Sequence, residues 1–121
     1  MSPDAVLGFR VVSAPAWRWM PGMKVFVAAG DGSGFARICE DGSAPSFADL
    51  RHAHLSDPAT LGCLVALVRE AWAGRGRAML WVPLADGGRW DVIVYDAAGA
   101  MLARFSGETE AEAWVNALEG A

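Results

Sequence analysis

The sequence predicts one α+β domain over residues 1–121, in which a mainly antiparallel sheet of about four to six strands carries two amphipathic helices. Strand-like runs follow one another with glycine-containing turns between them, and two segments repeat apolar residues at helical spacing. Strands and helices do not alternate strictly, which favours α+β over a parallel α/β arrangement. Because 54% of the 121 residues are hydrophobic, the chain can form a core without disulfides or a metal.

The N-terminal third has the weakest pattern. Residues 9–12 (FRVV) indicate a short edge strand. Residues 17–20 lie between Pro15 and Pro21, which favour an extended or turning backbone around them. No regular element is therefore predicted for residues 17–20.

A β-hairpin is predicted next, with strands at residues 24–29 and 35–40 and a turn at 30–34 (GDGSG). The turn resembles a phosphate-binding loop superficially, but such loops lead into a helix and this one leads into a strand pattern. Residues 41–56 show no sustained period. They are expected to form a surface connection with one short helical turn at 47–51.

The clearest helix is predicted to begin at Asp57, whose side chain can cap the first turn, with Pro58 at the first helical position. Gly74 is expected to end it. Gly62 lies inside the helix and suggests close approach by another backbone. The apolar stripe contains Leu61, Leu64, Val65, Val68, Ala71 and Trp72.

A three-stranded meander is predicted to follow, with strands at residues 78–84, 89–96 and 100–105. Turns centred on residues 86–87 and 98–99 set the register. The opposed pairs are then Trp81–Val92, Pro83–Trp90, Val92–Phe105 and Val94–Ala103.

The two faces of this meander differ in polarity. The first is predicted to be buried and holds Met79, Trp81, Trp90, Val92, Val94, Met101, Ala103 and Phe105. The second holds Arg89, Asp91 and Arg104 together with Leu80, Val82, Ile93, Tyr95 and Leu102. This second face is more apolar than a freely solvated one, so another segment, a second subunit or a partner protein is expected to cover part of it.

A second helix is predicted at the C-terminal end. Thr109 and Glu112 have the spacing of a capping box, and Gly120 is expected to end the helix. Its apolar stripe contains Ala111, Trp114, Val115 and Leu118.

Charge and hydropathy exclude several classes of partner. Ten basic and fourteen acidic residues give a net charge of -4, which argues against nucleic-acid binding because phosphates require a concentrated basic surface. No apolar run reaches the length of a membrane span, and no positively charged signal segment precedes an apolar one. Two isolated cysteines, Cys39 and Cys63, indicate a reduced, cytoplasmic setting. We therefore expect neither a nucleic-acid nor a membrane partner.

Catalytic and metal chemistry have weak candidates only, so no catalytic residue, metal or cofactor is predicted. His52 and His54 form a His-x-His pair that could bind a metal if the segment is extended, but a further ligand set is missing. Cys63 could act as a nucleophile with either histidine. A thiol among apolar neighbours has a raised pKa, however, which opposes that role.

Trp17, Arg18 and Trp19 are the candidate binding residues. They lie in an irregular segment bounded by prolines, and tryptophan beside arginine is the composition of an interface hot spot. The alternative is that this segment folds over the second face of the meander as an internal lid.

Three stretches resemble a family of small uncharacterised phage and prophage proteins of bacteria. They are residues 19–25 (WMPGMKV), 57–72 (DPATLGCLVALVREAW) and 109–119 (TEAEAWVNALE), where the family has leucine more often than Trp114. The resemblance implies phage or prophage origin and expression in the bacterial cytoplasm, but no activity. The resulting hypothesis is a non-enzymatic accessory protein that binds a host or phage protein or a second copy of itself. The alternative is a small Cys/His-dependent enzyme or metal-binding module.

Overall fold

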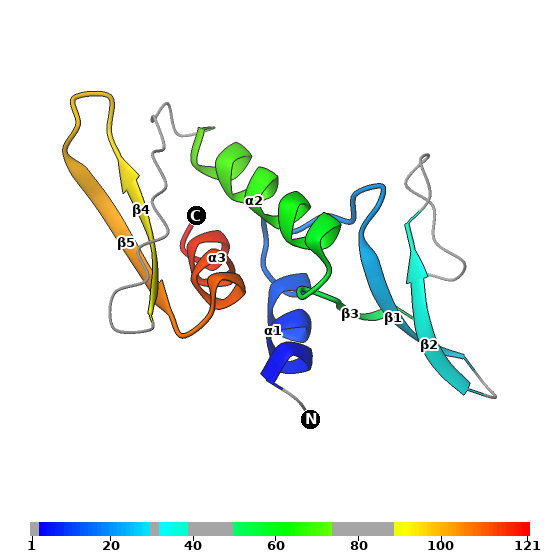
Figure 1. The fold of residues 1–121 in the computed structure, drawn as a ribbon. Coiled ribbons are helices and arrows are strands. Elements are labelled where there is room, and N and C mark those ends of the chain that lie inside the picture. Colours follow the sequence, from blue (N-terminus) through cyan, green and yellow to red (C-terminus); the bar gives the residue numbers. More distant parts are fainter. Residues whose placement is uncertain (1–2, 30–31, 39–49, 74–88) are drawn as a thin grey trace.

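The computed structural model describes residues 3–29, 32–38, 50–73 and 89–121 (Figure 1). Its elements are α1 (Pro3–Val12), β1 (Lys24–Ala29), β2 (Gly32–Arg37), β3 (Leu50–Ala53), α2 (Pro58–Ala73), β4 (Trp90–Tyr95), β5 (Met101–Gly107) and α3 (Glu110–Glu119). The strands form two antiparallel sheets, one of order β2-β1-β3 and one of β4-β5. The predicted α+β class is confirmed, although the described strands lie in two sheets instead of one.

Helix α3 lies between the β4–β5 sheet and the other two helices (Figure 1). Five of its ten residues are buried, and all five are apolar, which suits a helix in the interior. Trp72 of α2 donates from Nε1 to the carbonyl of Ala117 at 3.0 Å, and its ring lies 5.8 Å from that of Phe105 in β5. Arg10 of α1 pairs with Glu119 at 2.6 Å. The core is therefore assembled around α3.

The edge strand predicted at residues 9–12 is wrong, because these residues belong to α1. Asp4 lies in the first turn of the helix, where the helix dipole favours an acid. Leu7, Gly8 and Val11 form its buried side at helical spacing. The local strand-like composition is overridden by packing of this side against β3 and α3.

The helical turn predicted at 47–51 is also wrong where the structure describes it, because residues 50 and 51 belong to strand β3. β3 pairs with β1, with His52 opposite Phe26 and Ala53 opposite Val25. This pairing joins segments distant in sequence, so no local pattern in residues 41–56 indicates it. Residues 47–49 lie outside the described ranges.

The hairpin of β1 and β2 is confirmed, with β1 at the predicted residues and β2 beginning earlier, at Gly32. Lys24 lies opposite Arg37 at one end of the strand ladder. Gly22, just before β1, has a φ of +89°, which explains a glycine at this turn.

Helix α2 begins at Pro58, as predicted, and the backbone N–H of Thr60 donates to the side chain of Asp57 at 3.1 Å. The buried stripe is rotated from the predicted one: Leu61, Val65 and Ala71 are only partly buried. The fully buried positions are Thr60, Leu64, Leu67, Val68 and Trp72. The expected end at Gly74 lies outside the described residues.

Gly62 does not mark a close approach, since a Cβ placed there would meet no atom within 4 Å. The close approach is at Gly8 in α1, where a Cβ would lie 2.3 Å from the carbonyl oxygen of Ala53. Glycine therefore allows α1 to lie directly against β3.

The register of β4 and β5 is confirmed, with Val92 opposite Phe105 and Val94 opposite Ala103. A register shift at Tyr95 interrupts strict alternation, and Met101, expected to be buried, is 60% exposed. Of the second face, Ile93 is buried and Leu102 is exposed. The predicted strand at 78–84, with its Trp81 and Pro83 pairings, lies outside the described residues.

The capping of α3 is confirmed. The hydroxyl of Thr109 accepts from the backbone N–H of Glu112 at 3.1 Å, and Gly120 is the C-cap. Trp114, Val115 and Leu118 of the predicted stripe are buried.

Candidate functional site

One face of the β2-β1-β3 sheet carries a row of aromatic rings. Residues on this face alternate along each strand, and cross-strand pairing places Phe26 of β1 opposite both Phe35 of β2 and His52 of β3. We call the side chains of Lys24, Phe26, Phe35, His52 and His54 the aromatic face. Val25 and Ala53 alternate with them and are fully buried.

The rings of the aromatic face contact one another in sequence. Phe35 packs edge-on against Phe26 at 5.6 Å between centroids, and Phe26 stacks on His52 at 4.9 Å. Phe9 of α1 covers His52 at 4.8 Å. At the other end, Phe35 is 51% exposed. Helix α1 therefore closes the β3 end of the row and leaves the β2 end open to solvent.

Two basic side chains lie against the exposed Phe35 ring. The ammonium of Lys24 is 4.9 Å from the ring centroid, and the ring of His54 is 4.5 Å away. Within the described ranges, no carboxylate forms an ion pair with either side chain. The arginines Arg10, Arg18, Arg37 and Arg104, in contrast, each pair with an acid. Lys24 is the only lysine in the sequence.

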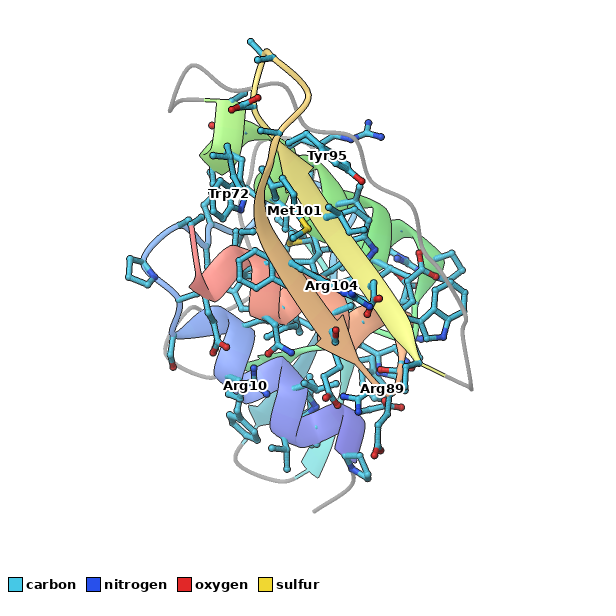
Figure 2. The ribbon with its side chains drawn as sticks, turned by 90° about the vertical axis from the view of Figure 1, so that its left-hand side faces the viewer. Arg10, Trp72, Arg89, Tyr95, Met101 and Arg104 are labelled. Atoms are coloured by element: carbon cyan, nitrogen blue, oxygen red, sulfur yellow. The ribbon has the colours of Figure 1, made fainter. Side chains whose placement is uncertain are left out.

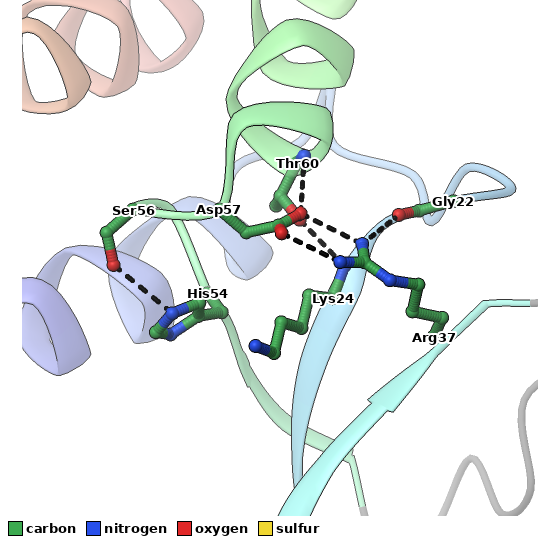
Figure 3. Close-up of polar contacts among 7 residues, drawn as sticks. All are labelled: Gly22, Lys24, Arg37, His54, Ser56, Asp57 and Thr60. Carbon is green, nitrogen blue, oxygen red and sulfur yellow. Dashed lines mark hydrogen bonds and ion pairs between the residues drawn. The ribbon is translucent and has the colours of Figure 1, made fainter.

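A polar network fixes the strand ends beside this site (Figure 3). Arg37 donates to both carboxylate oxygens of Asp57, at 2.9 and 3.0 Å, and to the carbonyl of Gly22 at 2.9 Å. The backbone N–H of Lys24 donates to the hydroxyl of Thr60 at 2.7 Å. The bond from Arg37 holds the pKa of Asp57 well below its usual range. The start of α2 is thereby tied to β1 and β2.

His52 and His54 lie on the same face, but in different surroundings. His52 is 91% buried among rings, its Nδ1 has no hydrogen-bond partner in the described part of the chain, and burial lowers its pKa. His54 lies with Nε2 3.2 Å from the hydroxyl of Ser56. Among the described residues, no three or more His, Cys, Asp or Glu side chains are placed to share a metal ion.

Trp17, Arg18 and Trp19 contribute to the core and to one contact with helix α2. The two indoles form an edge-on pair at 5.3 Å, both are partly buried, and both pack on the core. Arg18 pairs with Glu70 of α2 at 2.8 Å, with both side chains exposed. Arg18 therefore ties this segment to α2, while the two indoles contribute to the core.

Cys63 faces the same segment, with Sγ 4.0 Å from the carbonyl oxygen of Pro21. Burial raises the pKa of this thiol, and the charge of Asp57 adds to the effect. The described ring contacts of both histidines lie on the aromatic face, and no described contact joins either of them to Cys63. Cys39 lies outside the described residues.

The β4–β5 sheet faces the viewer in Figure 2, and its outer face differs from the aromatic face. Its central charges are matched: Arg104 pairs with Asp91, which also accepts from the hydroxyl of Ser106 at 2.6 Å. Met101 and Leu102, at the start of β5, are exposed. A hollow between α1 and the start of α3 is lined by charged residues of both signs, among them Asp4, Arg10 and Glu112. None of the predicted site residues lies in it.

Comparison with known proteins finds no matching family model and no significant match among curated proteins or solved structures. The resemblance to phage and prophage proteins therefore stays a prediction. In the ranges that the structure describes, no helix has both the length and the apolar character needed to cross a bilayer.

Sequence reasoning missed Lys24, Phe26 and Phe35 as a group. The signal that could have found them is the alternation within the predicted hairpin, which places Lys24 and Phe26 on one face of β1 and Phe35 next to them on β2. The contribution of His52 and His54 depends on β3, which the sequence pattern does not indicate.

Proposed function

We propose that the chain is a non-enzymatic accessory protein, of phage or prophage origin, that binds a host or phage protein in the bacterial cytoplasm through the aromatic face. The observation that carries the proposal is the half-exposed Phe35 ring held between a cation without a described carboxylate partner and His54. Exposed aromatic and basic side chains that are already fixed in place are typical of binding hot spots. Origin is inferred from the sequence resemblance, and location from that resemblance together with the two isolated cysteines.

The aromatic face is a better candidate than the Trp17–Arg18–Trp19 segment. In that segment, Arg18 is already paired with Glu70, and both indoles contribute to packing on the core. Replacing Trp17 or Trp19 would therefore change the stability of the fold as well as any binding. Phe35 is exposed enough for its replacement to leave the core intact.

A Cys/His-dependent enzyme is less well supported. A nucleophilic cysteine needs surroundings that lower its thiol pKa, and those of Cys63 raise it. The ring of His52 packs between those of Phe9 and Phe26. Binding through the aromatic face agrees with the described contacts of both histidines, and it does not require either histidine to lie near Cys63.

The test is a capture experiment followed by reconstitution. The tagged wild-type chain, Phe35→Ser and Met101→Ser would each be used as bait in bacterial lysate, and any specific partner would be purified and titrated by calorimetry. We expect Phe35→Ser to weaken the purified complex and Met101→Ser, an exposed apolar position on the other sheet, to leave it unchanged. Equal affinity of the two variants would contradict the proposal.

Light scattering separates a different protein from a second copy as the occupant. We expect the wild-type chain to have the mass of a monomer. A dimer that Phe35→Ser, but not Met101→Ser, converts to a monomer would assign the aromatic face to self-association and contradict binding of a host or phage protein there.

A further inference from the structure

We infer that the aromatic face recognises a protein segment in which a carboxylate side chain lies next to an apolar one, with the carboxylate on Lys24 and the apolar side chain on Phe35. This inference rests on the proposed function and adds the chemistry of the partner. It names a single type of occupant, an acidic-apolar segment of another protein.

The charge argument depends on Lys24. Its ammonium lies over the Phe35 ring, and no described acid pairs with it. The nearby guanidinium of Arg37 is already held by both oxygens of Asp57. An incoming carboxylate would therefore meet Lys24 as the available cation, and the ring beneath would exclude water from one side of the ion pair.

The apolar argument depends on Phe35 and its support. Phe26 packs edge-on against this ring, and Phe26 is itself stacked on the buried His52. The ring is thus fixed before a partner arrives, so little conformational entropy is lost on binding. Its exposed half is large enough for contact with an aliphatic or aromatic side chain, but too small to bury a whole helix.

A nucleic acid is the competing occupant, because it also combines negative charge with flat apolar groups. Single-stranded nucleic acids require a basic track that follows successive phosphates. The aromatic face offers one lysine, and the net charge of the chain is -4. One cation beside one exposed ring fits a single carboxylate and its apolar neighbour better than a row of phosphates.

The experiment uses fluorescent peptides and the full chain. The probes are a peptide of Glu-Leu-Ser repeats, the matched Gln-Leu-Ser peptide and a labelled oligothymidine, with binding measured by fluorescence anisotropy. We expect the Glu peptide to bind at least about tenfold more tightly than the Gln peptide, and Lys24→Gln and Phe35→Ser each to weaken it by about tenfold. Arg89→Gln and Met101→Ser, which change an exposed cation just before β4 and an exposed apolar residue of β5, should have no effect.

Carbodiimide cross-linking gives a second readout that does not depend on affinity alone. The reagent activates a peptide carboxylate, the Lys24 amine attacks it, and an amide forms as the urea leaves. Since Lys24 is the only lysine, mass mapping should place the cross-link there and distinguish it from one at the α-amino group. Circular dichroism on each variant verifies that the fold is retained.

Three results would overturn the inference. They are equal or absent binding of the Glu and Gln peptides, tighter binding of oligothymidine that Phe35→Ser abolishes, and cross-links that avoid Lys24. A purified partner whose affinity falls with Phe35→Ser but not with Lys24→Gln would also overturn it, while leaving the proposed function standing. A partner insensitive to both substitutions would contradict both.

Discussion

Asp57 joins the start of α2 to the hairpin through one buried carboxylate. It caps the helix by accepting from the backbone N–H of Thr60, and it accepts two further bonds from Arg37. Its backbone position as a cap follows from the sequence. Its role in holding β2 depends on Arg37, which approaches from a segment that the sequence pattern does not connect to it.

We expect Asp57→Ala to lower the free energy of unfolding by about 2 kcal/mol and Asp57→Asn by about half as much, because asparagine still caps the helix but cannot pair with Arg37. Urea unfolding at neutral pH measures the difference. The Asp57 pKa is lowered in the folded state, so its contribution is present above the ordinary aspartate pKa and lost as the pH falls through the folded value. Equal losses for alanine and asparagine would contradict this separation of cap and ion pair.

His52 predicts a second, distinct pH dependence. Burial and the nearby His54 lower its pKa, so the folded chain binds this proton less readily than the unfolded chain does. Stability should therefore be complete above the ordinary histidine pKa of about 6.5 and decrease as the pH falls below it.

His52→Phe tests this, because phenylalanine can keep the stack between Phe9 and Phe26 but cannot be protonated. The free energy of unfolding, measured by urea titration at several pH values between neutral and mildly acidic, should fall less with decreasing pH for His52→Phe than for the wild type. His54→Gln is the matched control and should retain most of this pH dependence, because burial is the larger cause of the lowered His52 pKa. An unchanged pH dependence in His52→Phe would assign the acid sensitivity to another group.

Two helical glycines have opposite predicted effects on the elements that contain them. At Gly62 in α2, a Cβ meets no atom within 4 Å, so Gly62→Ala should stabilise the fold by about 0.5–1 kcal/mol. At Gly8 in α1, a Cβ would collide with the carbonyl oxygen of Ala53. Gly8→Ala should destabilise the fold despite the higher helix propensity of alanine, because α1 must move away from β3.

Thermal unfolding of the two alanine variants, beside the wild type, measures both effects. The expected result is a higher midpoint for Gly62→Ala and a lower one for Gly8→Ala. Stabilisation by both substitutions would show that α1 does not lie against β3 as described.

Elements governed by local chemistry could be predicted from the sequence, and those governed by distant pairing could not. Caps at Asp57 and Thr109, together with the turn at Gly99, whose φ is +86°, mark boundaries that depend on a few adjacent residues. Strand β3 exists because it pairs with β1, and helix α1 because its buried side meets β3 and α3. These contacts have no signature within residues 50–53 or 3–12.

The whole molecule has α3 and α1 between its two sheets, so the sheets lie apart and expose different chemistry (Figure 1). On the β4–β5 sheet, Arg104 is matched by Asp91. On the aromatic face, no described acid matches Lys24. Alternation within the predicted hairpin could identify the Lys24, Phe26 and Phe35 part of this candidate site from the sequence. The other part required β3, whose two histidines complete the row of rings.

Footprinting of the only lysine tests most directly whether the aromatic face is a binding surface. The chain would be acetylated briefly with and without a saturating amount of the purified partner, and the modification of Lys24 would be compared with that of the α-amino group as an internal reference. We expect the partner to slow acetylation of Lys24 relative to the reference. An unchanged rate at Lys24 in the saturated complex would contradict docking on this face.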